Sequence, residues 1–145
     1  MADIAVLTRN YTTHLEPMLE KGESVTFYSN VPWKSIKDAH IEGKKVVVYF
    51  VVSEHPGLVS YEGTLADIVI PPVKDTAHLE KLLNRAPDKA ARAEVDKGTA
   101  RTIYSVSNVT KLTPAFSQTE LLKRSDGKAV SKDYERSYCI VHPYE

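Results

Sequence analysis

The sequence contains a single cysteine, Cys139, among its 145 residues. One cysteine can form neither an internal disulfide nor a zinc site built from several thiolates, so both classes of stapled fold are excluded. Long hydrophobic runs are also missing, because the longest, residues 46–52, is far below the roughly 20 residues that a membrane-spanning helix needs. No basic, hydrophobic leader follows Met1. We therefore expect a cytoplasmic protein that does not associate with membranes.

Charge of one sign is not in excess, since 19 basic residues balance 19 acidic ones. This balance argues against a protein that coats nucleic acid through bulk charge. It still permits binding of one nucleotide or a short strand, which needs only a local basic patch and an aromatic surface. Glycine-rich phosphate loops and metal-ligand spacing of the five histidines are also absent, so we expect neither a cofactor nor a metal.

Segments rich in β-branched and aromatic residues predict most of the secondary structure. The contiguous apolar residues of the first segment indicate a strand buried on both faces. The third and fourth segments are joined by the turn His55-Pro56-Gly57 and predict a central hairpin, bent near Gly63. The predicted strands are residues 3–8, 24–28, 45–52, 58–70, 101–112 and 138–141.

Helices are predicted between these strands from capping and breaking residues. The capping box at residues 13–16 predicts a helix that ends at Gly22, although Pro17 allows a start at Glu16. A short helix is expected at residues 35–41, and Pro87 divides a longer helical stretch into residues 76–85 and 88–97. A second capping box, residues 117–120, predicts a short helix through Leu122. Many strands and few helices in one domain, residues 1–145, predict an α+β fold with a small, mostly antiparallel β-barrel and flanking helices.

Three segments resemble the PUA-like superfamily, which includes the ASCH, EVE and YTH domains and uncharacterised archaeal or bacterial branches. The strand Ile4-Ala5-Val6-Leu7 ends in the polar run Thr8-Arg9-Asn10, similar to the first strand of YTH and EVE domains. Trp33 precedes a basic stretch and a central strand, much as a pocket tryptophan does in those families. Residues 61–68 look like their returning strand with its glycine. The resemblance implies a PUA-like barrel with a nucleotide pocket at one end.

The ASCH branch implies a different activity, the hydrolysis of an acylated nucleoside. In those enzymes a helix ends in Gly-x-Lys, and the lysine belongs to the catalytic set. Here the matching stretch begins Gly22-Glu23-Ser24, so serine stands where the lysine would be. Thr26 as nucleophile and Glu62 as acid or base are the remaining aligned candidates.

The residues that follow the first two strands have the chemistry of a nucleotide pocket. Trp33, the only tryptophan, and Tyr28 would stack on a base, while amide and hydroxyl groups read its edge and cations hold phosphate. For Trp33 the alternative is a lid packed on the barrel end. For Ser29 and Asn30 it is turn chemistry, and for Lys34 an ordinary charged surface. The predicted binding residues are Arg9, Asn10, Tyr28, Ser29, Asn30, Trp33 and Lys34.

Three functions remain open from the sequence. The first is a nucleic-acid-binding module for RNA, or for DNA, that takes a single base, and the resemblance implies that this base is a modified one. The second is an ASCH-like amidohydrolase that acts on a modified nucleoside. Of these two, we expect the binding module rather than the enzyme. The third is a protein-interaction domain, in which Trp33 would pack inward with no pocket beside it.

Overall fold

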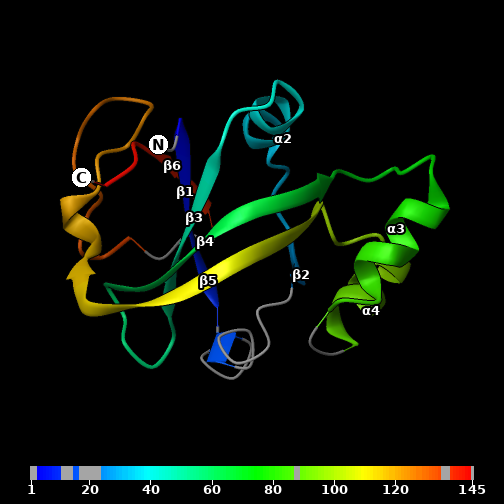
Figure 1. Cartoon of the computed structure of the whole chain (residues 1–145), viewed down its shortest axis with the longest axis horizontal. Helices are drawn as coiled ribbons and strands as arrows, with labels where there is room; N and C mark the ends of the chain where they lie inside the picture. The colour runs from blue at the N-terminus through cyan, green and yellow to red at the C-terminus, as the bar shows by residue number, and fades with distance from the viewer. Residues whose placement is uncertain (1–2, 11–14, 17–23, 87–88, 135–137, 145) are drawn as a thin grey trace.

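The computed structural model describes residues 3–10, 15–16, 24–86, 89–134 and 138–144. Its six strands form one sheet in the order β2-β5-β4-β3-β1-β6. Figure 1 shows the sheet curled around its own inner face, with α2 at one end and α3 and α4 beside the ends of β4 and β5. The strands are β1 (Ile4–Asn10), β2 (Val25–Ser29), β3 (Val46–Val52), β4 (Leu58–Val69), β5 (Thr102–Ser117) and β6 (Tyr138–Val141).

The sheet is a curled, mixed half-barrel rather than the small β-barrel expected from the sequence. β1 and β3 are parallel, and the other neighbouring pairs are antiparallel. β2 and β6 are the two ends of the strand order and do not pair with each other. The α+β class and the mostly antiparallel arrangement are confirmed. The prediction of a barrel was wrong because the edge strands β2 and β6 do not pair. Side chains of the inner cluster fill the space between them.

Both faces of the central strands are buried, as predicted for the first strand. Along β1, Ile4 and Val6 belong to the inner cluster, while Ala5 and Leu7 belong to the outer cluster. Residues of β3 alternate in the same way. A strand covered on both sides needs apolar residues at every position, which explains the continuous apolar runs.

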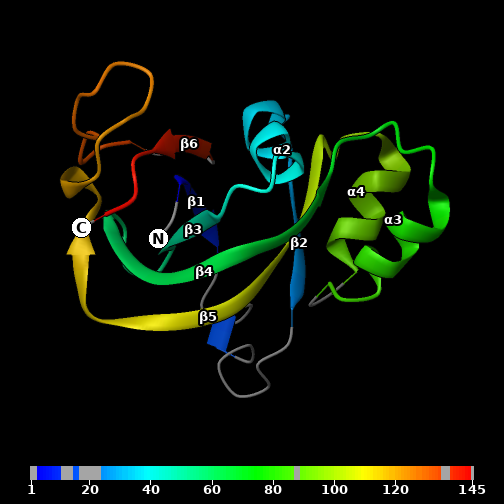
Figure 2. The ribbon, with the colours of Figure 1, turned by 45° about the horizontal axis from the view of Figure 1, so that its top comes forward.

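The predicted central hairpin is confirmed as β3 and β4. The strand after it is longer than predicted, since β5 continues past Leu112 to Ser117, which pairs with Leu58. Polar residues and Pro114 interrupt the apolar pattern there, so periodicity alone did not extend the strand. Register shifts between β4 and β5 on both sides of Thr64 and beside Val59 allow these long strands to curve, as Figure 2 shows.

The helices follow the predicted positions where the structure describes them. They are α2 (Lys34–Ile41), α3 (Thr76–Leu83) and α4 (Ala90–Lys97), and α4 ends at Gly98 in the left-handed conformation. The second capping box forms only the 3-10 turn η1 (Gln118–Glu120). Most of the helix predicted before Gly22, and Pro87, lie outside the described residues. Within the described part, no helix is long and apolar enough to cross a membrane.

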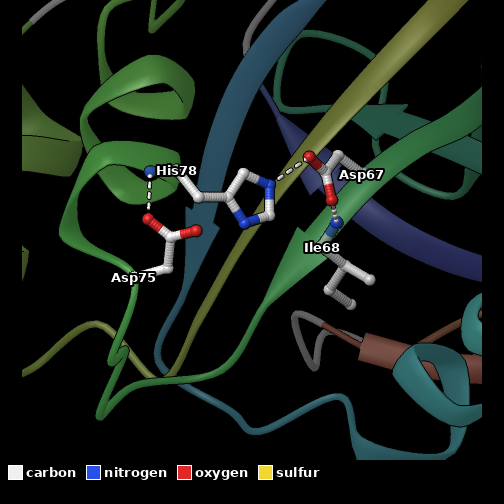
Figure 3. Close-up of polar contacts among 4 residues, drawn as sticks. All are labelled: Asp67, Ile68, Asp75 and His78. Carbon is white, nitrogen blue, oxygen red and sulfur yellow. Dashed lines mark hydrogen bonds and ion pairs between the residues drawn. The ribbon is translucent and has the colours of Figure 1, made fainter.

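α3 and α4 pack together on the outer face of the sheet. Leu82 and Leu83 of α3 share an apolar cluster with Ile103 of β5. At its edge, His78 Nε2 lies 2.5 Å from Asp67 Oδ2, and the second oxygen of Asp67 accepts from the Ile68 amide at 2.8 Å. Figure 3 shows this polar contact bridging α3 to β4, with Asp75 capping the start of α3. The contact fixes one helix of the pair to the end of β4.

Gly63 provides a test of the curvature, because a Cβ atom there would lie 2.5 Å from Val106 Cγ1 and 3.0 Å from Val109 Cγ2. We expect Gly63→Ala to lower the free energy of unfolding by about 1–3 kcal/mol, the usual cost of overpacking a core. Urea denaturation followed by circular dichroism measures the change. Ala66→Val is the control, since Ala66 is exposed on the same strand. Equal stability of Gly63→Ala and wild type would contradict the tight packing described here.

Candidate functional site

Trp33 lies inside the half-barrel with both ring faces covered. Its side chain is 0% exposed. The indole stacks on Tyr104 at a centroid distance of 4.2 Å and on Tyr138 at 5.1 Å. Tyr104 belongs to β5 and Tyr138 to β6, so the stack crosses the open side of the curled sheet. Of the two alternatives for this residue, packing on the barrel end is the arrangement in the structure, and a direct contact between the indole and a base stays a prediction.

The loop before α2 holds Trp33 in place through the first residue of β5. The backbone amide of Trp33 donates to Thr102 Oγ1 at 2.9 Å. The same hydroxyl donates to the Val31 carbonyl at 2.7 Å. Because Trp33 is also the N-cap residue of α2, this hydrogen-bonded loop sets both the depth of the indole and the start of the helix.

A groove of about 560 Å³ opens on the far side of this stack, between α2 and β6. Tyr138 both lines the groove and stacks on Trp33, so the indole forms a second aromatic layer behind the groove wall. Volumes of this size are common for small-ligand sites. The lining residues are Ile4, Ser35, Asp38, Ala39, Glu42, Lys44, Arg124, Ser125, Tyr138, Cys139 and Ile140.

Charges of both signs line the groove. On the α2 side, Lys44 Nζ lies 3.1 Å from Glu42 Oε2. Asp38 of α2 and Arg124, from the segment before β6, are both exposed. The groove therefore offers a carboxylate acceptor on one wall and a guanidinium donor from another segment. A ligand with hydrogen-bond donors at one end and an anionic group at the other matches this chemistry.

The alternation of the strands divides the predicted binding residues between the two faces of the sheet. Arg9 shares the outer face with Leu7 and donates to the Tyr134 carbonyl. Tyr28 is 38% exposed and lies on the face opposite to its neighbour Phe27, which is in the inner cluster. Adjacent strand residues point to opposite faces, so neither Arg9 nor Tyr28 points toward the indole of Trp33.

The directions of β1 and β2 separate the predicted set further. β1 is parallel to β3, and three successive antiparallel pairings lead from β3 to β2, so β1 and β2 run in opposite directions. Asn10, at the end of β1, therefore lies at the end of the sheet where β2 begins. Ser29 is buried at the other end, and its hydroxyl accepts from the Val31 amide at 3.2 Å. That contact is the turn chemistry offered as the alternative for this residue.

Asn30 and Lys34 are exposed near the start of α2. Lys34 precedes Ser35, which lines the groove. The predicted residues that the structure brings toward the groove are thus Trp33, behind its wall, and Lys34, beside its rim. The basic stretch that follows Trp33 also contributes Lys44, which lines the groove.

Sequence reasoning missed the half of the groove that comes from the end of the chain. Arg124, Ser125, Tyr138 and Cys139 line it. The apolar run of the last strand predicted that β6 exists. It did not indicate that β6 pairs with β1 and lies across from α2. Cys139 is 8% exposed, and burial raises the pKa of its thiol, which favours the unreactive protonated form.

A smaller cavity, of about 270 Å³, lies at the end of β3 away from the groove. Tyr61 donates to Glu16 there, and Lys111 Nζ is 3.8 Å from the same carboxylate oxygen. Val52, which pairs with Asn10, also lines this cavity. The end of β1 that the sequence indicated therefore adjoins this second cavity rather than the groove.

The two residues aligned with a hydrolase do not meet. Thr26 is fully buried on β2 and pairs with Ser105 of β5. Glu62 on β4 pairs with Thr110 of β5. Five positions along a strand correspond to about 16 Å, so Thr26 and Glu62 are too far apart for one to activate the other.

No protein-family model matches the sequence, and no curated protein matches it. Among solved structures, the chain is similar to the YTH domain of the Zygosaccharomyces rouxii MRB1 protein in complex with N6-methyladenosine RNA. The identity is 11%, the match covers 93% of this chain and 77% of that one, and the TM-score is 0.40. A TM-score this low establishes neither a shared fold nor a shared ligand.

The tyrosines around the core give a pH-dependent test of the packing. Burial raises the pKa of Tyr138 and of Tyr61 to about 12, and it also raises the pKa of Tyr104. Unfolding returns each pKa to about 10. The unfolded state thus ionises first, so the stability that these neutral rings contribute is present below pH 10 and is lost as the pH rises toward 12.

We therefore expect at least three of the eight tyrosines, namely Tyr61, Tyr104 and Tyr138, to remain largely neutral at pH 11 in the folded protein. Absorbance of tyrosinate near 295 nm, with and without denaturant, measures this difference. Tyr104→Phe should reduce the number of late-titrating groups by one. Complete titration of all tyrosines by pH 11 while circular dichroism still reports a folded protein would contradict the packing.

Proposed function

We propose that this domain binds nucleic acid, with single-stranded RNA as its partner, and that one base enters the groove between α2 and β6. The single observation that carries the proposal is the position of Tyr138, which lines the groove while Trp33 stacks behind it. An aromatic ring held from behind is a rigid platform, and stacking of a base on such a ring contributes about 1–3 kcal/mol.

The cations near this platform suit a phosphate backbone. Lys44 and Arg124 line the groove from two different segments, and Lys34 lies next to Ser35 at its edge. A protein of zero net charge gains little from bulk attraction to phosphates. Affinity would therefore depend on these few local contacts and on the stacked base.

RNA is favoured over DNA by the small hydroxyl side chains of the groove. Ser35 and Ser125 both line it, and a serine hydroxyl can both donate to and accept from a ribose 2′-hydroxyl. Deoxyribose lacks that partner. The preference is a part of the proposal that a comparison of matched RNA and DNA strands tests directly.

Tryptophan fluorescence tests the proposed site, since Trp33 is the only tryptophan. Its ring lies 5.1 Å from Tyr138, so a base that stacks on Tyr138 changes its environment without touching it. We expect a saturable change in emission on titration with short single-stranded RNA, with and without modified bases, and a weaker response to DNA of the same sequence.

Two variants at one position separate stacking from other effects. Tyr138→Phe keeps the ring and should bind RNA much as the wild type does. Tyr138→Ala removes the platform and should weaken binding by about 5- to 150-fold, the equivalent of one base stack. Circular dichroism confirms that each variant folds. Equal affinity of a folded Tyr138→Ala variant and wild type, or no RNA binding by wild type, would refute the proposal.

The cations are tested through the salt dependence of binding. Lys44→Ala and Arg124→Ala should each weaken RNA binding and lower the slope of log affinity against log salt by about 0.7, the value for one phosphate contact on a single strand. Lys97→Ala is the control, because Lys97 is 68% exposed on α4, away from the groove. Unchanged slopes for both groove variants would show that these cations do not contact phosphate.

A further inference from the structure

We infer that the groove selects a guanine base, through the carboxylate of Asp38. This inference rests on the proposed function and names the ligand class of the same groove. The two walls of the groove carry side chains of opposite charge. Asp38 belongs to α2, and Arg124 belongs to the segment whose backbone pairs with β6.

Asp38 is the carboxylate of the groove that has no counter-ion among the described residues. Glu42 is engaged by Lys44 at 3.1 Å, whereas no ion pair involves Asp38 in the part of the chain that the structure describes. An ionised carboxylate can only accept hydrogen bonds, and its two oxygens accept from two parallel donors. The groove therefore presents a two-pronged acceptor to whatever lies on Tyr138.

Among the common bases, guanine matches this acceptor best. Its pairing edge carries an N–H and an adjacent amino group, which are two parallel donors. Adenine and cytosine each offer an amino group beside a ring acceptor, and uracil offers one N–H between two carbonyl oxygens. A carboxylate would face a lone pair in each of these three cases, which costs affinity because two acceptors repel.

Arg124 complements this selection on the opposite wall. It comes from the segment whose backbone amide donates to the Ile140 carbonyl at 3.0 Å, so its position relative to Tyr138 is fixed by β6. A guanidinium there suits the phosphate of the same nucleotide, since guanidinium and phosphate form paired hydrogen bonds. Donor edge to Asp38, ring on Tyr138 and phosphate to Arg124 together describe a guanosine nucleotide.

Binding of short RNA strands that differ only in one central base tests the inference. We expect the guanine strand to bind about tenfold or more tightly than the uracil strand, the discrimination of one good two-pronged contact. Asp38→Asn should reduce this preference to about twofold or less. Asp96→Asn on α4, whose carboxylate is exposed and distant from the groove, should leave it unchanged. Guanosine monophosphate in a parallel titration shows whether a free nucleotide is bound as well as a base within a strand.

The emission of Trp33 separates failure of this inference from failure of the proposed function. Trp33 is the only tryptophan and stacks on Tyr138, which lines the groove, so any base that occupies the groove should change this emission. An equal change with all four strands, at equal affinities, would overturn guanine selection and leave nucleic-acid binding in place. No change in emission and no binding by any strand would overturn both. A preference for guanine that persists in Asp38→Asn would also overturn the role of Asp38.

Discussion

The stack of Tyr104, Trp33 and Tyr138 holds the two distant parts of the sheet at a fixed distance. Tyr104 is on β5, next to one edge of the sheet, and Tyr138 is on the other edge strand. Trp33 comes from a loop and fills the space between them. Stacked aromatic rings combine a large buried area with defined geometry. The half-barrel thus reaches a closed core without the backbone pairing that would close its sheet.

This arrangement also gives the groove its shape. α2 begins at Trp33, so the indole that fills the interior also sets where the helix lies. β6 supplies Tyr138 to the stack and, with its neighbours Cys139 and Ile140, one wall of the groove. A single buried ring therefore couples the stability of the core to the geometry of the surface proposed to bind a base. Its indole supports Tyr138, the residue that lines the groove.

The outcome for the predicted binding residues follows from the same sheet. They cluster in sequence because two strands end in polar residues, but strand ends meet only if the strands point the same way. β1 and β2 point in opposite directions, and alternation turns Arg9 and Tyr28 to the outer face. Trp33 lies behind the groove wall and Lys34 lies beside its rim because both belong to the start of α2. The interaction-domain alternative expected Trp33 to pack inward with no pocket beside it; Trp33 does pack inward, and the groove is lined by Tyr138 and not by Trp33.

The sequence by itself determined the local structure. Continuous apolar runs produced β1 and β3, a turn produced the central hairpin, and Gly98 ended α4, because each depends on neighbouring residues. The tertiary structure alone decided which strands form the two edges of the sheet, that β1 lies between β3 and β6, and that Arg124 and Tyr138 line the same groove as Asp38. These features depend on contacts between residues that lie far apart in the sequence, such as Ile4 with Val46 and Ala5 with Val141. Such contacts are set by how the whole core packs, and no short segment of the chain encodes them.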